Sequence, residues 1–520
     1  MDKFLKQYLL PLSVFVTGAC VLVIEIVAVR VLSFYYGNTI FTVSSVISVI
    51  LTALSIGYYM GGKFADRNPS LWWFFGIILV SGLTVLALHF VGMVILPILS
   101  ITLSMVSGPL VSSLLLFLAP ALLLGALSPY AVKLQSIQTS ERGVGSVSGE
   151  IFFWSTLGSI VGSLLAGFML IPYFGIDHIF IATGVLLFCL GFVPLVLLGF
   201  DKKRLTLSLF AVVILTLIIV LTDQQVKGDA VYSKDGVYGK IIIYDGVFDG
   251  RQTRFFQQDQ SNSSAIFLDS DDPTDLVYEY TKYYSLYKIF KPNVQNALVI
   301  GGGAYSIPKA LLWELPNATV DVSEIEPSLF DLAKKYFNAN NSQNLHSYTE
   351  DGRRLLRDSN KKYDLMFSDV YFLFLSPPAQ FTTREFFALA KEKLTDDGIF
   401  IANWIGDLSK EPPSLFFSEV NTFRSVFPNS YFFTVGMPET TDLQNMIVVG
   451  YNSNKKIDLS AASIFEHQNP IIRSLPYKAI NLEKYDLSLY PVLTDNFAPV
   501  EYLTAKALRR AYQDAPVRAR

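Results

Sequence analysis

Residues 297–303 read Ala-Leu-Val-Ile-Gly-Gly-Gly, and this stretch decides the fold of the second half of the chain. Four apolar residues followed directly by glycines predict a short buried strand, 297–300, that ends in a tight turn. Pro308 suits the first turn of a helix, so a helix is predicted over 308–315. Glycines also let a backbone approach a ligand closely, which makes this turn a candidate binding element.

The sequence on both sides of this turn alternates between strand and helix patterns. Such alternation is typical of a doubly wound, Rossmann-like sheet, whose ligands bind at the carboxyl ends of the strands. Upstream, residues 231–270 predict a small β-meander and residues 275–290 have helical spacing. The predicted strands are 240–244, 253–257, 265–268, 319–325, 346–349, 363–369, 399–404, 431–435 and 446–451, and the further predicted helices are 328–338, 353–358, 384–394 and 414–427.

Charge is distributed very unevenly along the chain. Residues 1–224 carry 18 charged side chains, 10 basic and 8 acidic, whereas the remaining 296 residues carry 67. Because an ordinary soluble domain has about 25% charged residues, the first part is membrane-like and the second is globular. The fold class is therefore an α-helical transmembrane bundle followed by an α/β domain. A membrane span needs about 20 apolar residues, and seven spans are predicted, at 9–33, 39–60, 71–97, 109–131, 150–171, 177–199 and 205–222.

The basic residues of this half predict its orientation. Lys and Arg lie at the N-terminus and in the second, fourth and sixth loops, whereas the third and fifth loops have none. Because cytoplasmic loops are enriched in these residues, the N-terminus is predicted to be cytoplasmic in a multi-pass protein of the cell (inner) membrane. Seven spans then place the globular half on the outer side.

Small residues recur on two predicted membrane helices, as Gly57-x-x-x-Gly61 and Gly158-x-x-x-Gly162. Such faces let helices approach closely. Packing within one subunit is the favoured interpretation, and a homodimer is the alternative. Glu25 is the one acid in the middle of a span, which makes it a candidate for transport or proton relay, with a structural anchor as the more ordinary interpretation.

Several classes of function are disfavoured by composition. The net charge of −3 divides into +2 for residues 1–224 and −5 for the remainder, without the clustered basic surface that a nucleic-acid partner requires. Cys20 and Cys189 both lie in apolar runs, and neither a CxxC nor an HExxH motif occurs. Neither a disulfide framework nor a metal cofactor is predicted.

Three positions at predicted strand ends point to an adenosyl ligand. Gly303 ends the turn, and Glu324, 21 residues later, ends the second strand, where an acid accepts hydrogen bonds from ribose hydroxyls. Asp351 follows the third strand, where a carboxylate can accept the exocyclic amine of adenine. The alternative is that Glu324 is a solvated strand end and Asp351 a helix N-cap.

A fourth acid, Asp369, ends the next strand and is expected to face the same cleft. A carboxylate in that place can accept a proton from an amine nucleophile or hold a cationic substrate. A turn-forming Asp is the ordinary alternative.

Motifs along most of the chain resemble the fused membrane spermidine synthase-like proteins. The globular half, from about 231 to 450, resembles the spermidine synthase (polyamine aminopropyltransferase) family in the order and spacing of its motifs. The motifs of that half are Ala297–Gly303, Glu324–Pro327, Glu350–Arg353, Tyr363–Asp369, Phe381–Phe386 and Gly398–Asn403, and those of the fused proteins are Glu25–Gly37, Gly61–Arg67, Gly167–Pro172 and Thr494–Glu501.

The resemblance implies a co-substrate of the S-adenosylmethionine type, normally the decarboxylated form, and a small amine acceptor. It implies that Gly301, Gly303 and Gly352 contribute to the co-substrate site, with Glu324 on the ribose and Asp351 on the adenine. Asp369 then corresponds to the catalytic acid/base, and Tyr371 to a substrate contact.

Two acids of the family pattern are missing. Ala304 stands directly after the glycines, before Tyr305 and Ser306, and Phe372 stands three residues after Asp369. The lost acids help to bind the cationic aminopropyl and diamine groups, so the amine half of the site is altered.

Other polar residues are candidates to complete the site. Asp495 and Glu501 are predicted to take over the substrate role if the C-terminal segment folds back over the cleft. Gln258, Gln260 and Asn262 all compete for the place of a Gln that the family has in the preceding hairpin.

These patterns together predict four segments and one leading function. The segments are a transmembrane domain (1–224), a β-rich subdomain (229–274), an adenosyl-binding domain (275–452) and a C-terminal extension over the cleft (453–520). The first hypothesis is a membrane-anchored, aminopropyltransferase-like enzyme with a nonstandard acceptor. The alternatives are an S-adenosylmethionine-dependent methyltransferase and a non-catalytic, adenosyl-binding or transport-coupled membrane protein.

Overall fold

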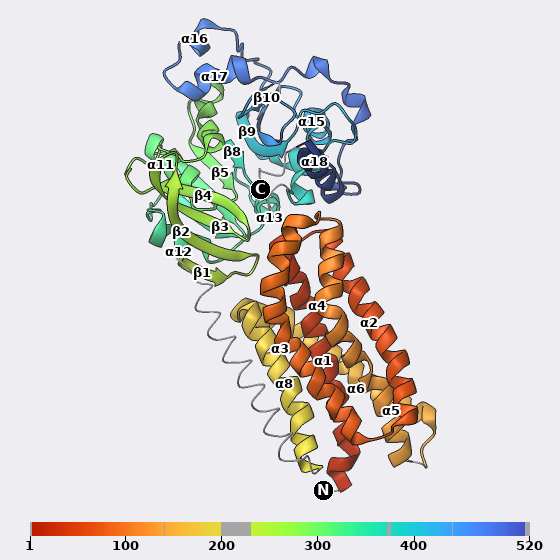
Figure 1. Cartoon of the computed structure of the whole chain (residues 1–520). Coiled ribbons are helices and arrows are strands. Elements are labelled where there is room, and N and C mark those ends of the chain that lie inside the picture. The colour runs from red at the N-terminus through yellow and green to blue at the C-terminus, as the bar shows by residue number, and fades with distance from the viewer. Residues whose placement is uncertain (1–2, 140, 199–229, 372–375, 439, 515–520) are drawn as a thin grey trace. The chain divides into compact units, whose positions relative to one another are not determined.

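The structure, a computed structural model, divides into two compact units, Met1–Gly228 and Asp229–Arg520. Figure 1 shows the helices of the first unit and the sheets and helices of the second. The residues that the structure describes are 3–139, 141–198, 230–371, 376–438 and 440–514.

Six helices of the first unit are long and apolar enough to cross a membrane, among the residues described. They confirm the first six predicted spans, and the seventh, 205–222, lies outside the described residues. The orientation of the chain depends on that seventh span, so the outer-side placement stays a prediction. The six candidate spans are Tyr8–Tyr36, Ile40–Arg67, Leu71–Leu88, Ser107–Gln138, Val144–Tyr173 and Ile176–Leu197.

The fourth span consists of two helices, because the helix breaks after Gly125, where Ala126 caps both. A short π-helical turn likewise interrupts the fifth span at Ala166–Leu170. The helices of this unit are α1 (Lys3–Tyr36), α2 (Ile40–Arg67), α3 (Leu71–Thr102), α4 (Ser107–Gly125), α5 (Leu127–Gln138), α6 (Val144–Leu165), α7 (Ile171–Tyr173) and α8 (Ile176–Leu197).

Glycines allow close contact between helices of this unit. A Cβ atom at Gly158 of α6 would lie 1.9 Å from the carbonyl oxygen of Phe15 in α1, and one at Gly162 would lie 2.2 Å from that of Ala19. In the same way, a Cβ at Gly57 would lie 2.3 Å from the carbonyl oxygen of Leu122. These small-residue faces are therefore filled by helices of the same chain, as expected for packing within one subunit.

We expect Gly158→Ala to destabilise the helical unit by about 1–3 kcal/mol, the usual cost of overpacking. The new methyl group would meet the backbone of α1, which cannot move aside as a flexible side chain would. Gly149→Ala on the same helix is the matched control, because nothing lies within 4 Å of its Cβ position. Thermal unfolding in detergent should show a lower midpoint for Gly158→Ala alone, and equal midpoints would contradict the close contact.

The second unit begins with a four-stranded antiparallel meander in the order β1-β2-β3-β4. The sequence predicts three of these strands but misses β1, whose burial pattern does not alternate strictly. The Asp249-Gly250 turn joins β2 to β3 with both residues at positive φ. The strands are β1 (Ala230–Asp235), β2 (Lys240–Phe248), β3 (Arg251–Gln258) and β4 (Ser261–Phe267).

A seven-stranded sheet follows, in the order β10-β11-β9-β8-β5-β6-β7. The strands from β7 to β9 are parallel, and β11 pairs antiparallel with both β9 and β10. The doubly wound order predicted from the sequence is confirmed, and its reversal point lies between β5 and β8. The strands are β5 (Asn296–Ile300), β6 (Thr319–Glu324), β7 (Leu345–Thr349), β8 (Tyr363–Ser368), β9 (Leu394–Gly406), β10 (Ser430–Thr434) and β11 (Gln444–Tyr451).

Helices cover both faces of this sheet. Ala297 and Val299 belong to one hydrophobic core with α11 and α17, whereas Leu298 and Ile300 belong to another with α14 and α15. Successive strand residues point to opposite faces, so an uninterrupted apolar run fits a sheet covered on both sides. The helices are α11 (Ser306–Glu314), α12 (Leu329–Tyr336), α13 (Gly352–Asp358), α14 (Arg384–Glu392), α15 (Leu415–Val426), α16 (Ala462–Phe465), α17 (Pro470–Lys478) and α18 (Val500–Asp514).

The segment 275–290 differs from the predicted helix. It forms a 3-10 helix, η2 (Glu279–Leu286), followed by one short α-helical turn, α10 (Tyr287–Phe290). Tyr283, Tyr284 and Leu286 are all buried in the sheet core. Consecutive buried side chains suit a tight segment that is packed on more than one side better than an amphipathic helix.

Candidate functional site

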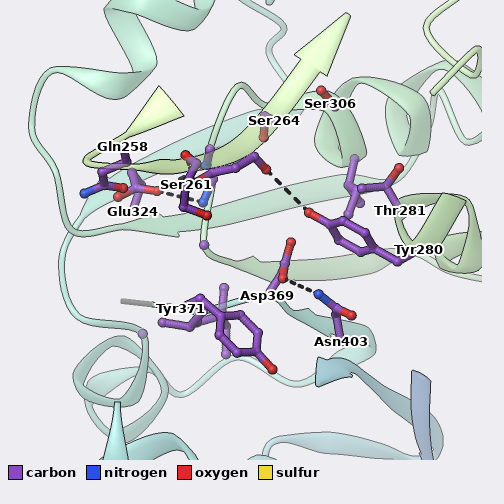
Figure 2. A pocket seen from close by; sticks show the side chains of 18 of the residues that line it. Gln258, Ser261, Ser264, Tyr280, Thr281, Ser306, Glu324, Asp369, Tyr371 and Asn403 are labelled. Atoms are coloured by element: carbon purple, nitrogen blue, oxygen red, sulfur yellow. Dashed lines mark hydrogen bonds between the residues drawn. The ribbon is translucent and has the colours of Figure 1, made fainter. Parts of the chain in front are cut away.

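A cavity of about 410 Å³ lies at the carboxyl ends of the central strands. Its floor is formed by the turn after β5, the end of β6 and the residues that follow β7 and β8. The hairpin of β3 and β4 and the segment η2 supply the other walls, as Figure 2 shows. The sheet therefore brings the predicted strand-end residues together in one pocket.

The glycine turn is shaped by close backbone contacts. Gly301 has φ +92°, and a Cβ there would lie 2.2 Å from the carbonyl oxygen of Asp369. Gly303 has φ +49°, and its Cβ position is 2.6 Å from Ser264 Oγ of β4. Only glycine combines this conformation with this proximity, so the turn lets β5 and β8 approach each other beneath the pocket.

Glu324 folds back onto the glycine turn. Its carboxylate accepts hydrogen bonds from the backbone N–H groups of Gly302 (2.8 Å), Gly303 (3.3 Å) and Glu326 (2.9 Å). Burial raises the pKa of Glu324, and the three backbone hydrogen bonds oppose this rise. A carboxylate held in this way at the end of β6 presents a fixed acceptor to the pocket.

Asp351 and Gly352 line the pocket where α13 begins. Asp351 is the N-cap of α13, because its carboxylate accepts the N–H of Arg354 at 3.0 Å. Asp351 is therefore both a helix N-cap, as the alternative interpretation predicted, and a residue of the pocket lining. Gly352 packs against Ile300, and a Cβ there would lie 2.4 Å from the Ile300 Cγ2 atom.

Asp369 is held by a relay of two amides. Asn403 Nδ2 donates to the Asp369 carboxylate at 2.9 Å, and Asn445 Nδ2 donates to Asn403 Oδ1 at 2.9 Å. Burial raises the pKa of Asp369, and the hydrogen bond from Asn403 opposes the rise. The arrangement fixes one carboxylate oxygen, as a positioned proton acceptor requires.

Two tyrosines flank this acid (Figure 2). The Tyr280 hydroxyl donates to the carbonyl oxygen of Ser263 at 3.4 Å, and the Tyr371 hydroxyl accepts the N–H of Ile405 at 2.6 Å. Burial raises the pKa of both phenols, so both stay neutral near pH 7.

The charges of the pocket are all negative among the lining residues that the structure describes. None of these residues is Lys, Arg or His. A pocket of this kind favours a cationic ligand. The carboxylates in the lining are Glu279, Glu324, Glu350, Asp351 and Asp369.

The acids of the lining and its uncharged residues lie mainly on opposite sides of β8 in the strand order. We call the side formed by β9, β11 and β10 the neutral side. Going from β8 toward β7, the lining carries Glu324, Glu350 and Asp351. In the other direction, β9, β11 and β10 contribute uncharged residues in the described part of the lining. The fifth acid, Glu279, comes from η2 and already pairs with Lys282 at 2.8 Å. The uncharged residues are Asn403, Ile405, Asn445 and Val435.

The predicted replacement acids lie elsewhere. Asp495 and Glu501 are not among the described lining residues. Asp495 forms a two-pronged pair with Arg353 (2.8 and 2.6 Å) and accepts a hydrogen bond from Thr383 at 2.7 Å. The substrate role of Asp495 stays a prediction, and in the structure its carboxylate links the C-terminal segment to Arg353 and Thr383. Glu501 lies in the first turn of α18.

The structure describes only one of the two positions, 304 and 372, at which the family has an acid and this chain does not. Ala304 is 1% exposed and packs in an apolar cluster with Phe256 and Leu329. Phe372 lies outside the described residues. Of the three candidates in the hairpin, Gln258 and Asn262 line the pocket, and Gln260 is not among its described lining residues.

Several lining residues are missed by the sequence-based prediction, namely Tyr280, Ser306 and Asn445. Asn445 is at the edge of the pocket only because β11 runs antiparallel to β9, which places its first residues beside Ile405. Asn403 carries a weak signal, since it is a polar residue inside an apolar strand pattern.

Comparisons with known proteins find similarity to spermine/spermidine synthases and polyamine aminopropyltransferases, and also to an N-methyltransferase. Residues 284–461 match the family model described as spermine/spermidine synthase domain. The chain is 26% identical over 249 residues to a polyamine aminopropyltransferase of Vibrio vulnificus, which covers 45% of this chain and 78% of that protein. It is also 26% identical over 417 residues to polyamine aminopropyltransferase 1 of Streptomyces coelicolor, covering 75% of each.

Similar solved structures include a probable spermidine synthase of Corynebacterium glutamicum. It is 17% identical, with a TM-score of 0.39, and the match covers 49% of this chain and 96% of that one.

Among the curated proteins there is also a shorter match, 32% identical over 160 residues, to an N-terminal histidine N-methyltransferase of Emericella nidulans. It covers 29% of this chain and 27% of that protein.

Proposed function

We propose, from the premise that this chain belongs to a spermidine synthase-like family, that it is a membrane-attached transferase. It would move an aminopropyl-type group from an S-adenosylmethionine-type co-substrate to an amine acceptor. The observation that carries this proposal is the position of Asp369, which faces the same pocket as Glu324 and is held by Asn403 at 2.9 Å.

The adenosyl half of the co-substrate would occupy the pocket from β5 to β7. Gly301 and Gly303 would let the ligand approach the backbone closely, and Glu324 would accept hydrogen bonds from the ribose hydroxyls. Asp351 would accept the exocyclic amine of adenine beside Gly352. The carboxylates of the described lining, of which Glu279 pairs with Lys282 and Glu350 with Arg354, favour the positive charge of a sulfonium.

Asp369 would take the proton of the acceptor amine. An ammonium group that gives its proton to this carboxylate becomes a nucleophile and attacks the methylene carbon attached to the sulfonium sulfur. The C–N bond forms, the C–S bond breaks, and its electron pair neutralises the sulfur, which leaves methylthioadenosine. Tyr371 and Tyr280 would enclose the reacting groups.

The acceptor would approach from the neutral side of Asp369. The described lining there carries amides and apolar side chains, and Glu279 is already paired with Lys282 at 2.8 Å. A diamine would leave its second ammonium group without a free carboxylate on that side, and an unpaired charge is costly to bury. This supports a nonstandard acceptor.

The membrane location is part of the proposal. The length and apolar composition of six helices favour a membrane-embedded N-terminal unit. A cytoplasmic N-terminus is proposed from the Lys and Arg distribution, and an outer-side globular unit follows only if the seventh span, 205–222, is also present. A methyltransferase is the alternative function, and the match to the Emericella nidulans N-methyltransferase favours it.

Glu324→Ala should weaken the binding of methylthioadenosine to the full chain by about 10- to 100-fold, the scale of hydrogen bonds to a charged group. Calorimetry on the detergent-purified protein would measure this. Glu501→Ala is the matched control, because that acid is not in the described lining of the pocket and should leave affinity unchanged. Equal affinities in the two folded variants would remove Glu324 from the site.

A further inference from the structure

We propose that the start of α11 binds a carboxylate, so that the preferred co-substrate is S-adenosylmethionine itself rather than its decarboxylated form. This inference rests on the proposed function and names the ligand of the same pocket. The binding corner is defined by Ser306, Ser264 and Thr281, which lie at one end of the pocket in Figure 2.

Ser306 has a buried hydroxyl without a partner. The residue is 8% exposed, it lines the pocket, and its Oγ makes no hydrogen bond within the described structure. Buried hydroxyls are usually paired, so an unpaired one in the lining of a pocket is a candidate contact for a ligand oxygen. A ligand oxygen at this corner would satisfy the group.

The helix that begins at Ser306 favours a negative charge. α11 has nine residues, no acid in its first turn and no side-chain cap from its N-cap residue, Tyr305. The N–H groups at a helix start carry a partial positive charge and bind anions. Tyr305 has φ +60°, and its hydroxyl forms a hydrogen bond with the hydroxyl of Ser347 at 2.6 Å. It therefore holds the start of the helix in place without capping it.

The other two residues that define this corner are polar and uncharged. Ser264 lies next to Gly303, and the Thr281 hydroxyl donates to the carbonyl oxygen of Tyr278 at 2.6 Å. Ala304 stands where the resembling family has an acid, and its side chain is buried among apolar residues. No carboxylate from position 304 therefore repels a ligand carboxylate here.

The chemistry of the transfer is unchanged by the extra carboxylate. The amine nitrogen still attacks the methylene carbon beside the sulfur, the C–S bond still breaks toward sulfur, and the proton still passes to Asp369. The group transferred would be 3-amino-3-carboxypropyl, and methylthioadenosine would again be released.

Calorimetry on the full-length protein tests this with S-adenosylmethionine, its decarboxylated form and methylthioadenosine. We expect S-adenosylmethionine to bind at least tenfold more tightly than the decarboxylated form. Ser306→Ala should weaken S-adenosylmethionine about tenfold and change the other two ligands less than twofold. Ser418→Ala is the control, since Ser418 is also buried, at 0% exposed, but its hydroxyl donates a hydrogen bond to the carbonyl oxygen of Ser414 and is not in the described lining of the pocket.

Ser306→Asp provides a second test, which does not depend only on the loss of affinity in Ser306→Ala. An acid suits the first turn of a helix, yet it would repel a ligand carboxylate and attract an ammonium group, so the preference between the two forms should reverse. Tighter binding of the decarboxylated form by the unaltered protein, or no effect of Ser306→Asp, would overturn this inference and leave the proposed function standing. Failure of all three ligands to bind would instead refute the proposed function.

Discussion

Asp369→Asn is expected to lower turnover by about 10²- to 10⁴-fold, the usual contribution of a positioned general base. Asparagine keeps the size and the contact with Asn403 but cannot accept the proton of an ammonium group. Asp369 is the one acid in the described lining that follows β8, between the adenosyl side and the neutral side. Transfer to an amine acceptor, followed by mass spectrometry, would measure the loss.

Binding and pH dependence separate this role from a structural one. Methylthioadenosine affinity should change little in Asp369→Asn, because the proposed adenosyl contacts lie at the ends of β5 to β7. Burial raises the pKa of Asp369, so the unaltered enzyme should lose activity on the acid side at a higher pH than an ordinary aspartate would give. Full activity in Asp369→Asn would reject the mechanism.

Gly301→Ala is expected to destabilise the globular unit by about 2–5 kcal/mol, combining a left-handed backbone conformation with overpacking. Its φ is +92°, and the added Cβ would lie 2.2 Å from the carbonyl oxygen of Asp369. The strand that carries Asp369 would have to move, so activity should fall together with stability. Chemical unfolding and the transfer assay would follow the two effects.

Gly250→Ala is the matched control for this change. Gly250 also has positive φ, +78°, but nothing lies within 4 Å of its Cβ position. Gly250→Ala should lower the free energy of unfolding only by the cost of a left-handed backbone conformation, about 1–2 kcal/mol. It should leave activity intact. Equal effects of the two substitutions would show that the contact between Gly301 and Asp369 is unimportant.

The fold could be predicted from local patterns because they are strong and consistent. Apolar runs such as 297–300 alternate with amphipathic helices, and this pattern predicts a doubly wound sheet. The segment 275–290 could not be predicted in this way, because its buried tyrosines contact the sheet core on more than one side. The strand β1 has too little alternation to be recognised.

The pocket shared by three acids was predictable, because each acid lies at or just after the end of a parallel strand. Glu324, Asp351 and Asp369 meet because parallel strands end at the same edge of the sheet. Asn445 could not be found in this way, since it lies near the start of an antiparallel strand. The pairing of Asp495 with Arg353 also could not be predicted, because the two residues are far apart in the sequence.

The most direct test of the central claim is the product formed by the purified full-length protein. The protein would be incubated with S-adenosylmethionine or its decarboxylated form and a panel of monoamines and diamines, with Asp369→Asn in parallel. Mass spectrometry should show methylthioadenosine and an amine that has gained the propyl-type group, both absent with the variant. Adenosylhomocysteine with a methylated amine would support the methyltransferase instead, and no product with any amine would contradict the transferase account.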